Sequence, residues 1–308
     1  MEFTYRTRPK RDRRREPLPI NQVNKDKSGL FVLVVSSYEV AMPIESLLTP
    51  MTLTVGYLAA ILIGVSKTGV PGVGLFSCLL MISAFKGHEM FAAGATVPLL
   101  ILGDLAAVKF YRKDCDVLLL KRLCPPVVIG LLLGAVTLCF MQNSQFKLTV
   151  GILAASILIF EFIRRKTGWT KVSTSKSFSF GCGMLAGLTT MLGNAAGAIS
   201  SVYFSSQGLD KKKFMGTNAV FFFLVNVSKI PLMIAVTHTK TFLGYEADDA
   251  QIMNMTTFLL TLIFSPGILI GGYLGRQFYR MIPENIFVPF ILAVNFITAA
   301  YIVVSAAV

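Results

Sequence analysis

Runs of apolar residues about as long as a bilayer is thick recur along this sequence. A transmembrane helix needs about 20 predominantly apolar residues. The chain is 54% hydrophobic and 15% charged, with a mean hydropathy of +0.66, so it has too little polar surface to cover a soluble globule of 308 residues. This pattern predicts an all-α integral membrane protein with eight apolar blocks, at 51–85, 91–111, 123–141, 147–163, 177–206, 214–236, 254–278 and 286–308.

The first and fifth blocks are longer than one crossing requires, and each contains a glycine cluster near its middle. The first cluster is Gly69-Val70-Pro71-Gly72-Val73-Gly74, and the second is Gly193-Asn194-Ala195-Ala196-Gly197. Glycine costs about 1 kcal/mol relative to alanine inside a helix, and proline about 3 kcal/mol, so such clusters favour local unwinding. We therefore expect each of these blocks to form a broken or re-entrant helix.

The two halves of the apolar region resemble each other. Gly94-Ala95-Thr96 and Gly103-Asp104 align, at one constant offset, with Gly216-Thr217-Asn218 and Val225-Asn226. Two related halves, each opening with an interrupted helix, are typical of secondary transporters whose site lies between the halves. We divide the chain into a polar, basic N-terminal extension at 1–45, a first transmembrane repeat at 46–170 and a second at 171–308.

A second internal similarity concerns glycines that allow close helix packing. Pro126, followed by Gly130 and Gly134, resembles Pro266, followed by Gly271 and Gly275. Glycines spaced four residues apart let two membrane helices approach closely, so we interpret both pairs as packing positions.

Short basic gaps between the blocks predict the topology. They lie at 109–122, 164–176, 211–213 and 276–280. All four can face the cytoplasm only if the fifth block enters and leaves on one side as a hairpin of half-helices, which makes the two halves inverted relative to each other. The acidic gap at 246–249 then lies outside. This layout places the basic N-terminal extension outside, against its charge. We base the topology on the short loops, because long tails obey the charge rule less strictly.

Lys67 is a lone ammonium group inside apolar sequence, and Lys229 lies about two-thirds of the way along the sixth block. An ionisable residue at bilayer depth costs several kcal/mol, and such residues usually face a cavity or a charged partner. Two ammonium groups from opposite halves suit a compact anion. The alternative for each, stronger for Lys229, is that the side chain reaches the membrane interface.

The glycine clusters supply further candidates for an anion site, because an unwound segment exposes backbone N–H groups and a half-helix points its positive end into the gap. With hydroxyl and amide side chains as neutral donors, the candidate substrate-binding residues are Lys67, Thr68, Gly69, Gly72, Gly74, Thr96, Asn194, Gly197, Asn218, Asn226 and Lys229. A hydroxyl in a membrane helix often bonds its own backbone instead.

Asp104 places a carboxylate well inside an apolar block, and Asn226 occupies the equivalent position in the other half. It is a candidate for proton coupling, ionised on one side of the membrane and neutral on the other. The alternative is that Asp104 pairs with Lys67 or Lys109 and only balances charge.

Several classes of function are disfavoured. The five cysteines show no C-x-x-C spacing, and we expect reduced thiols, no metal site and no cofactor. No nucleophile constellation or phosphate loop is visible, so an enzyme is not expected. The net charge of +13 comes from gaps between apolar segments rather than from a basic stripe on a folded domain, so we expect a lipid bilayer and not a nucleic acid as the large partner.

The motifs resemble those of the sulfite exporter TauE/SafE family of membrane permeases. The resemblance rests on 66–74 (SKTGVPGVG), Gly103-Asp104 leading to Tyr111-Arg112-Lys113, Pro126 with its two glycines, and Asn226 with Lys229 and Pro231, and it spans about 51–308. It implies a compact helical transporter of two related halves that moves small sulfur-containing or organic anions, in the cell (inner) membrane. The basic N-terminal extension lies outside the resemblance.

We therefore predict a permease for small anions, sulfite or an organosulfonate, that works by alternating access, with proton coupling as an added hypothesis. A small carboxylate is the chief alternative substrate, and a membrane-embedded enzyme or a scaffold is an alternative of another class. The sequence leaves the direction of transport and the oligomeric state open, a homo-oligomer included.

Overall fold

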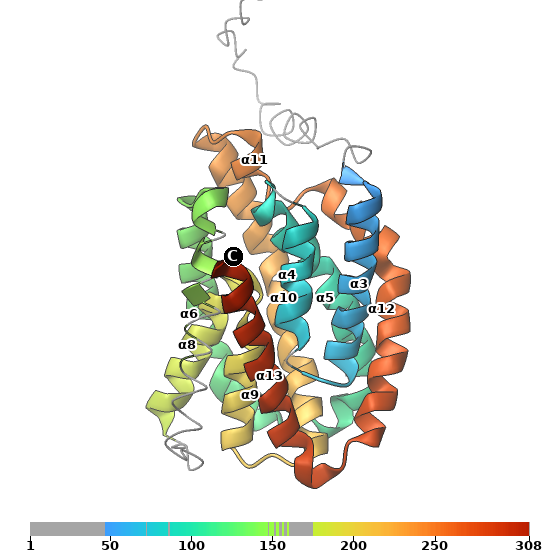
Figure 1. Ribbon diagram of the computed structural model, residues 1–308. Helices are drawn as coiled ribbons and strands as arrows, with labels where there is room; N and C mark the ends of the chain where they lie inside the picture. The colour runs from blue at the N-terminus through green and yellow to red at the C-terminus, as the bar shows by residue number, and fades with distance from the viewer. Residues whose placement is uncertain are drawn as a thin grey trace, which may run out of the picture. The chain divides into compact units, whose positions relative to one another are not determined.

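The computed structural model describes residues 47–71, 73–85, 87–146, 148–150, 152–153, 156, 159 and 175–307, and at 247–248 and 298–307 the backbone alone. These residues belong to one compact unit, Tyr38–Val308. Every regular element within them is a helix (Figure 1), which confirms the predicted all-α class. The N-terminal extension at 1–45, Gly72 and most of the block at 147–163 lie outside the described residues.

The first apolar block forms two helices, α3 (Pro50–Thr68) and α4 (Val73–Ala84), so the predicted break is present. Thr49 caps the start of α3 by accepting a hydrogen bond from the Thr52 N–H at 3.1 Å. At its end, the Thr68 carbonyl accepts one from the Tyr111 hydroxyl at 2.6 Å. The chain then turns back, and α4 returns toward the end from which α3 entered (Figure 1).

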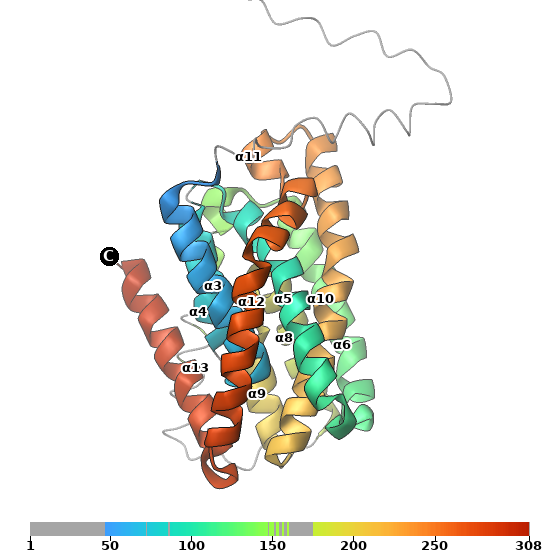
Figure 2. The ribbon, with the colours of Figure 1, turned by 90° about the vertical axis from the view of Figure 1, so that its right-hand side faces the viewer.

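The fifth block also forms two helices, α8 (Lys176–Gly193) and α9 (Ala196–Ser206). Between them, Asn194 adopts a left-handed conformation with φ 56°, which ends α8 and reverses the chain. Asparagine tolerates this conformation better than most residues. The α8–α9 hairpin enters from the end opposite to that of α3 and α4 (Figures 1 and 2).

Long helices surround the two hairpins. They are α5 (Glu89–Tyr111), α6 (Val117–Cys139), α10 (Lys211–Phe242), α12 (Met255–Met281) and α13 (Glu284–Ala307), with short turns η1 (Arg112–Asp114) and α11 (Ala247–Ala250). Five helices of the described part are long and apolar enough to cross a membrane, namely α3, α5 with η1, α6, α10 and α12. The protein is therefore a membrane protein.

The glycine pairs of the two halves pack across the halves. A Cβ at Gly271 on α12 would meet the Ile61 carbonyl oxygen on α3, and one at Gly130 on α6 would meet the Met184 carbonyl oxygen on α8. The glycine-bearing helix of each half thus lies against the broken helix of the other. These two contacts hold each hairpin against a long helix of the other half.

The two hairpins enter from opposite ends, an arrangement compatible with an inverted repeat. The connection between α5 and α6, the start of α10 and the end of α12 lie at one end, while α11 lies at the other (Figures 1 and 2). Three of the four basic gaps therefore share an end, and the acidic gap at 246–249 is opposite. The fourth basic gap, at 164–176, falls mostly outside the described residues.

Candidate functional site

The breaks of the two hairpins meet at a small cavity of about 40 Å³. Pro71 and Gly74 line it from the start of α4, and Asn194 and Gly197 line it from the start of α9. Each of these helices begins at the cavity, so the positive ends of two helix dipoles converge there. A Cβ built on Gly197 would have no neighbour within 4 Å, which shows that this helix start opens onto free space.

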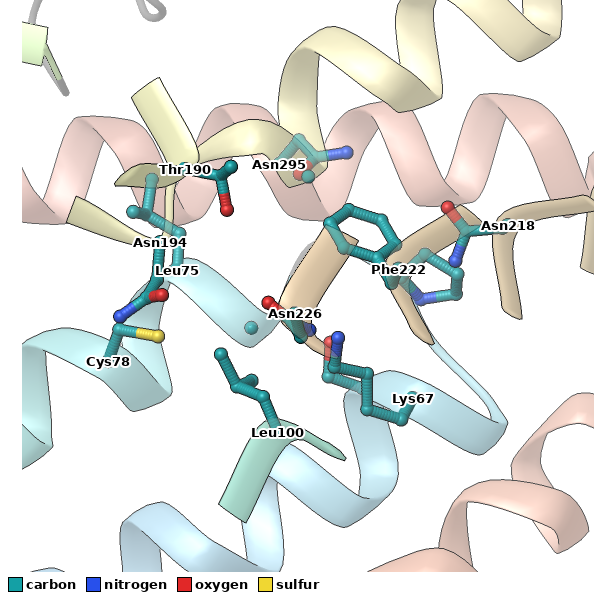
Figure 3. Close-up of a pocket in the computed structure, with 14 residues that line it drawn as sticks. Lys67, Leu75, Cys78, Leu100, Thr190, Asn194, Asn218, Phe222, Asn226 and Asn295 are labelled. Carbon is teal, nitrogen blue, oxygen red and sulfur yellow. The ribbon is translucent and has the colours of Figure 1, made fainter. Parts of the chain in front are cut away.

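Lys67 lies at the edge of this cavity, near the end of α3 (Figure 3). Its Nζ lies 2.8 Å from the Asp104 Oδ1 on α5 and 4.3 Å from the centroid of the Phe222 ring on α10. The other Asp104 oxygen accepts a hydrogen bond from the Asn226 side-chain amide at 2.7 Å. Lys67, Asp104 and Asn226 thus form one buried chain of polar contacts that joins the two halves.

Lys229 on α10 is fully buried and donates a hydrogen bond to the Asn194 Oδ1. The Asn194 amide nitrogen in turn donates to the Ala93 carbonyl oxygen at 3.3 Å. The side chain therefore does not reach the membrane interface, which was the alternative for this residue. Its contact holds the left-handed residue at the α8–α9 break instead.

Three amides that line the cavity carry a buried atom without a hydrogen-bond partner in the described part of the chain. These atoms are the Oδ1 of Asn218, the Oδ1 of Asn226 and the Nδ2 of Asn295. A buried polar atom left unpaired costs about 1–3 kcal/mol. A polar ligand or water in the cavity would remove this cost.

The structure brings together Lys67, Gly74, Asn194, Gly197, Asn218 and Asn226 at the cavity, and it places Lys229 and Asp104 directly behind them. Thr68, Gly69 and Thr96 lie elsewhere. The Thr68 hydroxyl donates to the Gly272 carbonyl oxygen at 2.8 Å, and the Thr96 hydroxyl donates to its own helix. A Cβ at Gly69 would meet the Gly275 backbone. Gly72 lies outside the described residues.

Some residues at the cavity escaped the sequence analysis. They are Leu75, Cys78, Leu100, Thr190, Phe222 and Asn295 (Figure 3). Asn295 has a sequence signal of its own, because it is an amide inside the apolar block at 286–308. The apolar members carry none, because which face of a helix meets the cavity depends on packing between distant segments.

Two further lysines, both on α10, make contacts away from the cavity. Lys211, which is half-buried, donates to the Tyr279 and Ile282 carbonyl oxygens at 2.5 and 2.6 Å. Lys240, which is fully buried, donates to the Leu138 carbonyl oxygen at 3.3 Å and to the Met141 carbonyl oxygen. Each therefore caps the C-terminal end of a long helix, α12 at one end of α10 and α6 at the other.

Comparison with known proteins agrees with this architecture. The family model of the sulfite exporter TauE/SafE matches residues 55–302, a range that holds the breaks of both hairpins and the whole cavity. No curated protein and no solved structure matched the chain. The match confirms the resemblance inferred from the motifs. The chain belongs to the sulfite exporter TauE/SafE family.

Proposed function

We propose that this protein carries a small anion, with sulfite as the first candidate, across the membrane through the cavity between its two hairpins. The observation that carries the proposal is the convergence of Lys67 with the starts of α4 and α9 on one cavity. Ammonium groups and helix N-termini both favour negative charge. Family membership supports transport of a sulfur oxyanion.

The size of the cavity favours a compact ion. A cavity needs about 10–15 Å³ to hold one water molecule. A cavity of about 40 Å³ therefore suits a charged group of a few heavy atoms. Sulfite meets this description, as does the carboxylate group of the alternative substrate class.

Binding would exchange partners at Lys67. In the structure, the Lys67 ammonium group is held by the Asp104 carboxylate at 2.8 Å. An incoming anion competes with that carboxylate, and a proton on Asp104 would release Lys67 to the anion. This exchange provides a physical route to proton-coupled transport, in which one proton and one anion move together.

Alternating access is the transport mode that the two hairpins favour. They enter from opposite ends, and each is packed by glycines against a long helix of the other half. Movement of one half against the other would open the cavity first to one side and then to the other.

The test is counterflow of radiolabelled sulfite in proteoliposomes that contain purified protein. We expect labelled sulfite to accumulate transiently when unlabelled sulfite is trapped inside, and short carboxylates to compete weakly. Counterflow of labelled acetate or propionate, with little counterflow of labelled sulfite, would assign the carboxylate alternative. No counterflow of either anion by folded protein would contradict transport of small anions.

A further inference from the structure

A second and larger cavity, of about 550 Å³, is lined by α8, α9 and α13 together with Leu153 and Ser156. Ligand pockets in proteins commonly have volumes of about 300–1,000 Å³. Its walls are mostly apolar, and they include Cys182, Leu185, Ile199, Val202 and Leu292. A Cβ built on Gly181 of α8 would have no neighbour within 4 Å, so this wall leaves open space.

Asn295 lines both this apolar cavity and the central cavity. Consecutive residues of the hairpin also divide between the two. Thr190 and Gly197 face the central cavity, whereas Thr189 and Ala198 face the apolar one. The two cavities therefore lie on either side of the α8–α9 break and meet at Asn295, whose Nδ2 has no hydrogen-bond partner in the described residues. Figure 3 shows Asn295 at the margin of the central cavity, beside Thr190 and Phe222.

We propose that the apolar cavity receives the hydrocarbon tail of an organic anion whose charged group occupies the central cavity. This inference rests on the proposed function, because it takes the central cavity as the anion site. A small polar cavity with a lysine, which shares the lining residue Asn295 with a larger apolar cavity, matches a ligand with one charged end and one aliphatic end. Short linear alkanesulfonates have this chemistry, and Asn295 would contact the junction between head and tail.

The test is isothermal titration calorimetry in lipid nanodiscs with the series from methanesulfonate to hexanesulfonate, with protein-free nanodiscs as the blank. Burying one methylene group contributes about 0.8 kcal/mol, which corresponds to about a fourfold gain in affinity. We expect the dissociation constant to fall by up to about fourfold for each methylene added.

Two glycines form a matched pair of variants, because both have open space where a Cβ would stand. Gly181→Leu fills the apolar cavity only, so we expect methanesulfonate to bind as before while the gain with chain length disappears. Gly197→Leu fills the central cavity, so we expect it to weaken every member of the series. Ala198→Leu is a second variant of the first kind, and thermal unfolding shows whether each variant is folded.

The outcomes separate the two proposals. Binding of sulfite and methanesulfonate without any gain from longer chains would overturn the tail pocket and leave the anion site standing. The tail pocket is also overturned if Gly181→Leu keeps the full dependence on chain length, or if the apolar cavity instead holds a bilayer lipid that co-purifies in stoichiometric amount. Failure of every anion to bind folded protein would contradict the proposed function itself.

Discussion

The lysines at the centre of the protein differ from the lysines at its two ends. Lys67 and Lys229 contact side chains, the Asp104 carboxylate and the Asn194 amide oxygen, beside a cavity. Lys211 and Lys240 contact main-chain carbonyl oxygens at the ends of α12 and α6. A side-chain partner can be exchanged for a ligand. The last carbonyls of a helix need a permanent donor, so the end lysines stabilise the scaffold.

The carbonyls capped at the two ends stand at equivalent positions of the predicted repeat. Leu138 and Met141 follow Gly134 by four and seven residues, and Tyr279 and Ile282 follow Gly275 by the same spacings. Both donors come from α10, although the acceptors come from different halves. The acceptors thus follow the predicted repeat, whereas the donors do not. At the centre, the carboxylate of Asp104 in one half faces the amide of Asn226 in the other, so the charge there is asymmetric.

The largest effect on stability should come from breaking the central ion pair. Removing one partner of a buried pair costs about 3–5 kcal/mol, because the other charge stays buried without compensation. Lys67→Met and Asp104→Asn should each lower the free energy of unfolding, and the double variant should recover most of the loss. Chemical denaturation in mild detergent measures this cycle, and additive losses would show that the two residues are not coupled.

The end lysines should contribute less to stability and nothing to binding. A hydrogen bond to a charged group is worth about 1.5–3 kcal/mol. Lys211→Met and Lys240→Met should therefore lower the free energy of unfolding by about that amount, while the sulfite affinity of the folded protein changes less than about twofold. A large loss of affinity in Lys240→Met would erase the proposed distinction between central and end lysines.

Asp104→Asn tests whether the central carboxylate carries a proton. With one proton moved for each anion, a pH difference of one unit is worth about 1.4 kcal/mol, or about a tenfold accumulation. Asparagine keeps the shape but cannot titrate, so Asp104→Asn should lose accumulation driven by a pH gradient and keep exchange at equal pH. If the variant still accumulates sulfite along a pH gradient in proteoliposomes, Asp104 only balances the charge of Lys67.

Cysteine labelling tests which end of the protein faces the outside of the cell, and we expect the substitutions to have almost no effect on function. In a cysteine-free background, Lys212→Cys at the basic end should be protected from an impermeant thiol reagent added outside intact cells. Glu246→Cys at the acidic end should react. Labelling of both positions would mean that α10 does not separate the two sides, and the reverse pattern would invert the orientation.

Much of the fold was predictable from the sequence, because helix breaks depend on local residue types. The Gly69–Gly74 and Gly193–Gly197 clusters indicated both breaks, since glycine, proline and asparagine act on their own backbone. The central lysine was also predictable, because a charge inside an apolar run needs a partner wherever it lies. The sequence did not decide whether Asp104 pairs with Lys67 or Lys109 or has another role. In the structure, Asp104 is the partner of Lys67.

Other parts of the site depended on packing between distant segments. The Thr68 and Thr96 hydroxyls resemble ligands in the sequence, but each donates to a backbone carbonyl, Thr68 to Gly272 on α12 and Thr96 to Ala92 on its own helix. Lys229 was expected at the substrate, and its contact is with Asn194, at a break formed by another helix. Phe222 and Asn295 reach the cavity only because α10 and α13 turn those faces inward.

The central claim is that Lys67 provides the positive charge that holds the anion, and the most direct test is calorimetric sulfite binding to three proteins. These are the wild type, the neutral double variant Lys67→Met/Asp104→Asn, and Lys240→Met as a control for the loss of a buried lysine. Loss of a buried charged contact costs about 2–5 kcal/mol, or about thirty- to several-thousand-fold in affinity. We predict a loss of that size in the double variant and wild-type affinity in Lys240→Met. Wild-type affinity in a folded double variant would contradict the account.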